Sequence, residues 1–155
     1  DAPLYVRGGS IIPMLPPAAL PSAGDDTAAA TGGVQLVVAL DAQGASGKAE
    51  GVIFVDDMTS LKTVEAGNYL TVAFAATGSK LNSTVTHAGA AGKTLSKIQS
   101  VEVWGVSTSV AKVMVTVAGK VTEVPKGQWT SAKGSLHVSG LMNVSMLQPF
   151  ELAWE

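Results

Sequence analysis

The acidic residues are the first candidates for chemistry, and the chain has twelve of them, two histidines and no cysteine. The adjacent Asp56 and Asp57 could ligate Ca²⁺, but a hard cation takes about six oxygen ligands. No further acidic series follows the pair to supply those oxygens. Carboxylates at the end of a strand also accept backbone N–H groups in a turn. We therefore interpret Asp56 and Asp57 as structural, and we predict no metal site and no cofactor.

The two histidines show no catalytic pattern. His87 and His137 lie in different expected strands, and neither has a serine, cysteine or carboxylate at the spacing of a triad or a metal site. Gly-Lys pairs such as Gly119-Lys120 lack the spaced glycines of a phosphate-binding loop. The sequence therefore predicts neither nucleophilic catalysis nor nucleotide binding.

Aromatic side chains could stack on sugars, because their faces pack against the apolar C–H faces of pyranose rings. Most of the candidates are expected in the core or at a domain interface, namely Tyr5, Tyr69, Trp104 and Trp154. Trp129 is flanked by small and polar residues, and we expect it in an exposed loop. It is the candidate for sugar stacking.

Two triplets fit the acceptor pattern for N-linked glycosylation, Asn82-Ser83-Thr84 and Asn143-Val144-Ser145. Alternation places Asn82 on the outward, polar face of an expected strand, where a glycan would fit. Asn82 and Asn143 are therefore candidate glycosylation sites. They favour the secretory pathway, with an extracellular, lysosomal or vacuolar destination.

The elements that must position these residues are strands. Residues 34–40 are a continuous apolar run of strand length, as in a strand buried on both faces. Residues 68–77 alternate, with one apolar face that consists of Leu70, Val72, Phe74 and Ala76. The last strand carries an apolar stripe at period two, which consists of Phe150, Leu152 and Trp154.

Turn residues separate the expected strands. Ala118-Gly119-Lys120 lies between the alternating segments 113–117 and 121–124, which predicts a hairpin. Residues 16–33 read as a long loop, and residues 41–48 read as a boundary. The expected strands follow one another at intervals of roughly ten to fifteen residues, and no segment of convincing length shows the periodicity of a helix. We predict an all-β fold, an antiparallel β-sandwich.

The segment that starts at Pro3 reads Pro-Leu-Tyr-Val-Arg-Gly-Gly-Ser-Ile-Ile-Pro. Gly8-Gly9 allows a tight reversal with positive φ between two strand-forming stretches, and Pro13 is expected to end the second strand. Arg7 could cap backbone carbonyls or pair with a carboxylate. The segment predicts a strand, a turn and a strand.

Residues 50–60 form a second motif, Glu-Gly-Val-Ile-Phe-Val-Asp-Asp-Met-Thr-Ser. In order and spacing, the two motifs resemble the Arg-Gly-Gly-x-Ile-Ile-Pro and Gly-aromatic-strand-Asp-Asp-Gly-x-Ser signatures of α-glucosidases of glycoside hydrolase family 31. Met58 stands where the family has glycine, which puts a positive-φ turn there in doubt. The residues that carry the resemblance, all in structural roles, are Arg7, Gly8, Gly9, Ile11, Ile12, Pro13, Asp56 and Asp57.

The resemblance implies the C-terminal part of a retaining α-glucosidase. Retaining hydrolysis needs two carboxylates about 5 Å apart, and in this family both lie in a barrel upstream of these motifs. No acidic residue here lies in a segment that resembles either of them, so no catalytic residue is carried over. The resemblance also implies that residues 1–42 end a proximal C-terminal β-domain and that residues 43–155 form a distal β-sandwich domain. The catalytic barrel region, on a separate chain or in a missing segment, is the expected partner, because an incomplete sheet leaves unpaired edges.

Length and charge are consistent with this hypothesis. A chain of 155 residues with 46% hydrophobic residues can hold an ordinary core. A net charge of −2 gives no electrostatic case for nucleic acid or an anionic membrane, and no apolar run reaches the ~20 residues that span a bilayer. Because the chain begins with Asp1, we expect a cleaved or partial polypeptide.

Three functions remain open at this point. The first is a scaffold that packs against the barrel of an α-glucosidase-like enzyme. The alternatives are a carbohydrate-binding β-sandwich that captures an α-glucan through Trp129, and a structural assembly subunit without an enzymatic role.

Overall fold

The computed structural model describes residues 5–15, 33–43, 46–56, 60–89, 96–106 and 109–155. The described elements are strands and one short 3-10 helix, η4 (Lys126–Gln128). The strands are β1 (Ser10–Met14), β2 (Val34–Ala39), β3 (Lys48–Val55), β4 (Leu70–Thr77), β5 (Lys80–Ala88), β6 (Ile98–Val106), β7 (Val113–Val117), β8 (Lys120–Glu123), β9 (Trp129–Ala132), β10 (Gly134–Val138) and β11 (Phe150–Trp154). The all-β prediction is confirmed.

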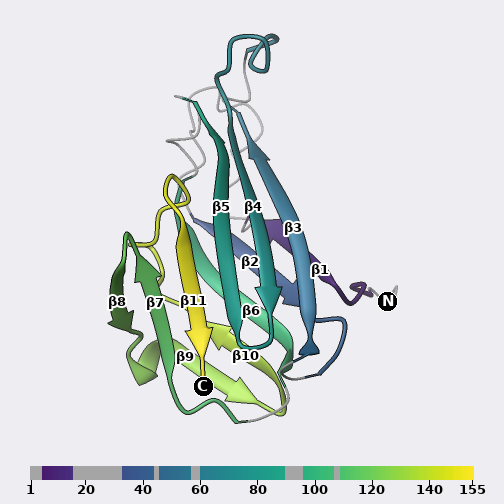
Figure 1. Cartoon of the computed structure of the whole chain (residues 1–155), viewed down its shortest axis with the longest axis vertical. Helices are drawn as coiled ribbons and strands as arrows, with labels where there is room; N and C mark the ends of the chain where they lie inside the picture. Colours follow the sequence, from purple (N-terminus) through teal and green to yellow (C-terminus); the bar gives the residue numbers. More distant parts are fainter. Residues whose placement is uncertain (1–4, 16–32, 44–45, 57–59, 90–95, 107–108) are drawn as a thin grey trace, which may run out of the picture.

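The eleven strands form one sheet in the order β8-β7-β11-β5-β4-β3-β1-β2-β6-β10-β9 (Figure 1). Neighbours run antiparallel, except that β1 pairs with β3 and β2 pairs with β6 in parallel. The β1–β2 hairpin is inserted between β3 and β6, and this insertion produces both parallel pairs. The sheet is therefore mixed where β1 and β2 enter it, whereas the described strands of residues 43–155 pair with one another antiparallel, as predicted. Alternation along a strand defines its two faces but does not specify the direction of its neighbour.

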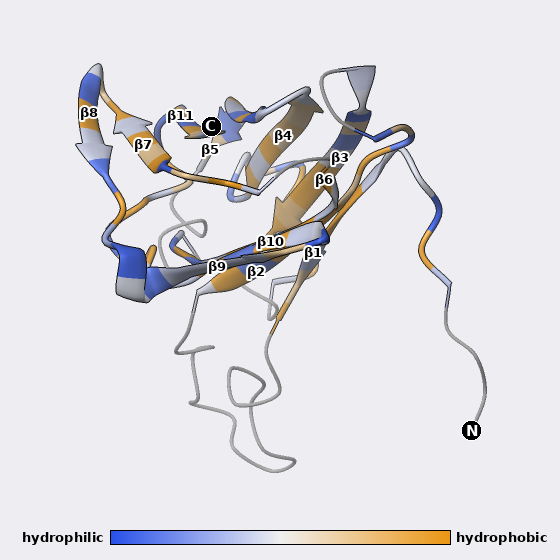
Figure 2. Ribbon diagram, turned by 90° about the horizontal axis from the view of Figure 1, so that it is seen from below, coloured by the Kyte–Doolittle hydropathy of each residue, from blue (hydrophilic) through white to orange (hydrophobic). Residues whose placement is uncertain are grey.

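The sheet curls so that its two halves face each other like the layers of a sandwich (Figure 2). One half contains β4, β5, β11 and β7, and the other contains β2, β6 and β10. The apolar side chains between them form one core, to which Leu36, Phe74, Val101 and Leu152 all belong. Burial of this apolar surface is the main favourable contribution to folding.

Several strand predictions are confirmed in detail. β2 is buried on both faces, since neighbouring residues such as Val37 and Val38 are both inaccessible. On β4 the predicted face from Leu70 to Ala76 points into the core. The stripe on β11 is also buried. Ala118 and Gly119 have φ values of 50° and 78°, and they form the two-residue turn that joins β7 to β8.

The start of the chain differs from the prediction in two respects. Residues 5–7 are described but do not form a strand, so the turn at Gly8-Gly9 is followed by a strand without being preceded by one. Pro13 lies inside β1, which continues to Met14. β1 pairs with β3 only at Ser10. At Pro13, β1 pairs with β2 but not with β3. A proline, which lacks an N–H, is tolerated at such a position.

The strands on either side of the expected boundary are hydrogen-bonded neighbours. β1 and β2 lie between β3 and β6 of the same sheet. The division of the chain at residues 42 and 43 remains a prediction. The expected loop at 16–33 falls almost wholly outside the described residues. Among the described residues, no helix has the length and apolar character that crossing a membrane requires.

Candidate functional site

The two sequence motifs meet in space at the start of β1 and the middle of β3. Gly9 has a φ of 88°, a left-handed value that favours glycine. Its N–H donates to the carbonyl of Ala39 at 2.7 Å, and its carbonyl accepts the N–H of Glu50 at 3.1 Å. Ser10 is aligned with Glu50 in the parallel β1–β3 pair. The turn of the first motif is thus hydrogen-bonded directly to the second motif.

Gly51 lets these two motifs approach closely. A Cβ on Gly51 would collide with the carbonyl oxygen of Ile11 and would lie 2.8 Å from the Ile11 Cβ. Gly8 is similarly close to the chain after β2, since a Cβ there would lie 3.2 Å from the Leu40 oxygen. The glycines of both motifs therefore have a packing role in this structure.

Asp41, which follows β2, and Lys48, which begins β3, are joined by two hydrogen bonds. The Asp41 N–H donates to the Lys48 carbonyl at 3.0 Å, and Asp41 Oδ1 accepts the Lys48 N–H at 2.7 Å. Gly105, with a φ of 95°, packs against this corner, where an added Cβ would lie 3.0 Å from the Leu40 Cβ. The corner is closed by backbone contacts, and the Asp41 carboxylate is used to close it.

The predicted motif side chains have different environments. Asp56 Oδ2 accepts a hydrogen bond from the buried Thr63 hydroxyl at 3.5 Å, a local contact with a side chain, whereas backbone N–H donors were expected. Asp57 lies outside the described residues. Arg7 is exposed and forms no ion pair with a described carboxylate. Its capping or pairing role remains a prediction.

An apolar patch lies on the outer face of the sheet next to the motif junction. It consists of Ile12 and Met14 on β1 and Val52 and Phe54 on β3, and we call it the β1–β3 patch. Because Ser10 and Glu50 are aligned, residues two and four positions further along each strand point to the same face. The four side chains are 38% to 60% exposed. Apolar side chains that are gathered in this way mark a surface for contact with another surface.

Phe54 is held in place by a stack of rings. Its ring lies 5.2 Å from that of Tyr69, and the Tyr69 ring lies 3.9 Å from that of His87, with both pairs stacked. His87 Nε2 is 2.8 Å from the carbonyl oxygen of Gly67, which fixes the far end of the stack. His87 thus makes contacts that a structural histidine would make, and Phe54 is a half-exposed ring stacked on Tyr69.

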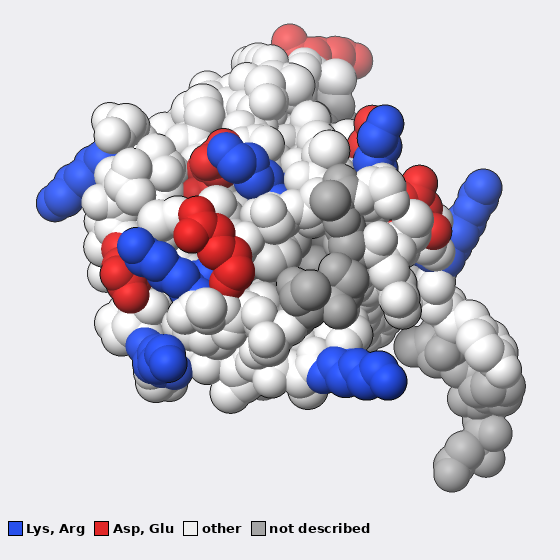
Figure 3. Space-filling view, turned by 60° about the horizontal axis from the view of Figure 1, so that its bottom comes forward, with Lys and Arg blue, Asp and Glu red and all other residues white. Residues whose placement is uncertain are grey.

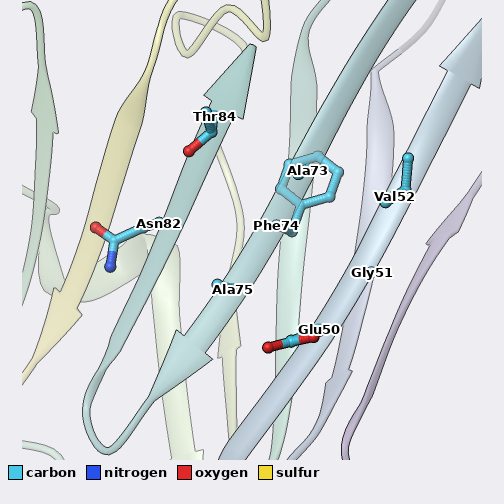
Figure 4. Close-up of a pocket in the computed structure, with 8 residues that line it drawn as sticks. All are labelled: Glu50, Gly51, Val52, Ala73, Phe74, Ala75, Asn82 and Thr84. Atoms are coloured by element: carbon cyan, nitrogen blue, oxygen red, sulfur yellow. The ribbon is translucent and has the colours of Figure 1, made fainter. Parts of the chain in front are cut away.

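A shallow groove of about 450 Å³ runs beside the patch along β4 (Figure 4). The small side chains of Ala73 and Ala75 lie between Glu50 and Val52 on β3 and Asn82 and Thr84 on β5. Such small residues leave room for a flat contact surface but supply few polar groups to orient a small ligand.

The carboxylates on described strands, those of Glu50, Glu102, Glu123 and Glu151, lie on four different strands. Glu50 aligns with Ala75, Ala75 with Asn82, and Asn82 with Glu151. Glu50 and Glu151 are therefore three strand spacings apart, about 14 Å, whereas a retaining pair needs about 5 Å. Glu151 pairs instead with Lys80 at 3.2 Å. Acidic and basic side chains lie side by side on the face shown in Figure 3, and no cluster of potential metal ligands occurs within the described ranges.

The structure places two of the three tryptophans, Trp104 and Trp129, differently from the prediction. Trp129 opens β9 and packs against the core while half-buried, rather than lying in an exposed loop. Trp104 is more exposed, at 37%, and its Nε1–H donates to Glu102 Oε1 at 2.8 Å. Alternation on β6 already placed Trp104 opposite the apolar Val103, and this signal could have identified the exposed indole. Sugar stacking by Trp129 remains a prediction.

No protein-family model matches the chain. Known proteins can nonetheless be aligned with nearly the whole chain. The chain is 30% identical to human sucrase-isomaltase and 28% identical to bovine lysosomal alpha-glucosidase, in each case over 97% of its own length. It spans only 8% and 14% of those two relatives.

Solved structures show the same fold. A glucosidase II alpha subunit with bound DNJ superposes with a TM-score of 0.70 over 96% of this chain and 17% of that one, at 20% identity. An alpha-1,4-glucan lyase from Gracilariopsis lemaneiformis has a TM-score of 0.59 over 100% of this chain, at 16% identity. The sequence and structure comparisons agree.

Proposed function

The chain matches one region of the glucosidases of glycoside hydrolase family 31, and on this premise we propose that it forms the non-catalytic C-terminal β portion of an α-glucosidase-like enzyme. In this role it packs against the catalytic barrel and supports it. Retaining hydrolysis of the α-glucosidic bond belongs to a pair of carboxylates on the barrel. The barrel is on a separate chain or in another part of the same polypeptide.

The β1–β3 patch is the observation that carries this proposal. The two motifs that identify the family also build the patch, since Gly9 positions β1 and Gly51 allows β1 to lie against β3. The outward side chains of the same two strands are Ile12, Val52 and their neighbours. A surface whose geometry depends on family motifs is a natural contact for the rest of the enzyme.

Burial of this patch would stabilise the barrel. Each Å² of apolar surface removed from water contributes about 25 cal/mol. Phe54 is well suited as an anchor, because its ring is already ordered by Tyr69 and loses little freedom on binding. A barrel held from one side keeps the loops at the mouth of its active site in position, and positioning contributes to the rate.

A pair of matched substitutions tests the contact. Val52 on the patch and Val121 on β8 are equally exposed, at 60% and 61%. Val52→Asp should weaken co-purification with the catalytic part of the enzyme by about tenfold or more, because it buries a charge in an apolar contact. Val121→Asp should leave both co-purification and maltose hydrolysis unchanged. Equal effects of the two substitutions, or none, would exclude this face as the contact.

The cellular location follows from the same premise. The relatives include lysosomal and intestinal enzymes, and the structural neighbours include an ER enzyme. We place this protein in the secretory pathway, with an extracellular, lysosomal or vacuolar destination. Immunolocalisation of the native protein checks the compartment.

A second function, capture of an α-glucan, is favoured by the exposed indole on β6. The Trp104 side chain is oriented by Glu102, and an ordered aromatic face beside a carboxylate suits a sugar ring. Tryptophan-fluorescence titration with malto-oligosaccharides separates the two functions. A scaffold gives no saturable change, whereas a binding module gives one that Trp104→Ala removes.

A further inference from the structure

The acceptor triplet at Asn82 lies on a part of the surface that the scaffold role does not use. Asn82 is exposed near the start of β5, and Thr84 is exposed on the same face. Between them, Ser83 points inward, where its hydroxyl accepts the Phe150 N–H at 2.8 Å. The alternation of the strand thus presents the asparagine and the threonine of the triplet together to solvent.

The surroundings of Asn82 have room for a sugar. Asn82 separates the groove over β4 from a second groove of about 410 Å³, which Thr116, Gly119 and Pro149 help to line. In Figure 4 the Asn82 amide points away from Ala73 and Ala75 and toward the side of β11. The small side chain of Ala75 lies beside Asn82 on β4, and Glu151, which is aligned with Asn82 on β11, pairs with Lys80.

The triplet at Asn143 has a different environment. Asn143 is exposed in a turn, but Val144, the next residue, is buried and its carbonyl accepts the Ile98 N–H at 3.0 Å. Asn143 also lines a cavity of about 540 Å³ with residues of the β7–β8 hairpin such as Lys120. Asn82 lies on a strand, whereas Asn143 lies in a turn, and both side chains are exposed.

We infer that Asn82 carries an N-linked glycan that extends over β11. A bond forms between Asn82 Nδ2 and C1 of an N-acetylglucosamine, while the bond from that C1 to the diphosphate of a lipid-linked oligosaccharide breaks. The lipid diphosphate leaves, and the amide gives up one proton. The inference goes beyond the scaffold role. It requires passage through the secretory pathway but no contact with a barrel.

A glycan at this position would distinguish a solvated face of the molecule from the face that carries the β1–β3 patch. A bulky, solvated sugar chain keeps the face of β5 and β11 in water. The β1–β3 patch lies on the other side of the β4 groove, and the glycan leads away from it. The chain therefore has one outer region for contact and another for solvent.

The experiment uses the whole chain, produced behind a secretion signal in cultured animal cells. Protein from cells and medium is treated with a peptide N-glycanase in water enriched in heavy oxygen, which converts a glycosylated asparagine into a labelled aspartate. Mass spectrometry then examines the peptide that contains residue 82. Thr84→Ser keeps the acceptor pattern, and Thr84→Val removes it with almost the same shape.

The expected result is label at residue 82 in the parent chain and in Thr84→Ser, and none in Thr84→Val. Absence of label at residue 82 in both the parent and Thr84→Ser, while a co-expressed secreted glycoprotein is labelled, would overturn the inference. Label in Thr84→Val would overturn it as well. Val52→Asp should be labelled like the parent, so loss of the patch contact and loss of the glycan are distinguishable.

Discussion

Substitution of Gly51 by alanine probes the junction of the two motifs. The added methyl group would collide with the carbonyl oxygen of Ile11 on the neighbouring strand. The obstacle is backbone, so rotation of a side chain cannot relieve it. β1 and β3 must instead move apart at the point where Glu50 donates its N–H to Gly9 at 3.1 Å.

The expected cost has two parts. Overpacking by one methyl group costs about 1 to 3 kcal/mol, and loss of the Glu50–Gly9 hydrogen bond costs about 0.5 to 1.5 kcal/mol. We therefore expect Gly51→Ala to lower the free energy of unfolding by about 1.5 to 4.5 kcal/mol, a large share of the roughly 5 to 15 kcal/mol typical of a domain. Alanine also lowers the conformational entropy of the unfolded chain, and this effect offsets less than about 1 kcal/mol of the expected destabilisation.

Urea titration followed by tryptophan fluorescence measures the effect. Gly127→Ala is the matched control, since nothing lies within 4 Å of a Cβ at that position, and it should change the free energy of unfolding by no more than about 0.5 kcal/mol. If Gly51→Ala and Gly127→Ala unfold at the same urea concentration, the close approach of the two motifs is refuted.

Two further substitutions and one double-mutant cycle are checked by the same titration. Ser83→Ala removes the acceptor of the buried Phe150 N–H and should destabilise by about 1 to 3 kcal/mol; no change would mean that the hydrogen bond is absent. Leu152→Ala empties a fully buried position on β11 and should cost about 2 to 5 kcal/mol, and a smaller cost would contradict its place in the core. A double-mutant cycle on the exposed pair Lys80 and Glu151 should give a coupling of at most about 1 kcal/mol; a larger value would contradict its exposure.

Local features of the fold could be predicted from the sequence because they depend on neighbours in the chain. The alternation from Leu70 to Ala76 identified the buried face of β4, and Ala118-Gly119 identified the β7–β8 turn. The all-β class follows from repeated features of this kind. The two glycine-containing motifs, with their order and spacing, were sufficient to indicate the family.

Features that depend on distant neighbours were not predicted. Insertion of the β1–β2 hairpin between β3 and β6 sets two parallel pairs, and nothing in the residues of β1 specifies that neighbour. Pro13 was expected to end a strand but lies inside β1. Whether a proline, which lacks an N–H, interrupts a strand depends on which neighbouring strand β1 pairs with at that position. Trp129 has polar neighbours in the sequence and yet packs on the core, because its contacts come from elsewhere in the chain.

The candidate surface was partly accessible to the same reasoning. A strand was expected just before Asp56, but the exposure of Val52 and Phe54 was not predicted, since an apolar run does not reveal which of its faces is covered. The stacked rings of Phe54, Tyr69 and His87 come from β3, the residue before β4, and β5. No local sequence pattern predicts that these three rings meet.

The rate of thermal inactivation of the catalytic part, measured by maltose hydrolysis with and without this chain, tests the scaffold role most directly. The account predicts that the chain forms a complex with the catalytic part and slows its inactivation, and that Val52→Asp abolishes the protection whereas Val121→Asp does not. A catalytic part that is equally active and equally durable alone would contradict it.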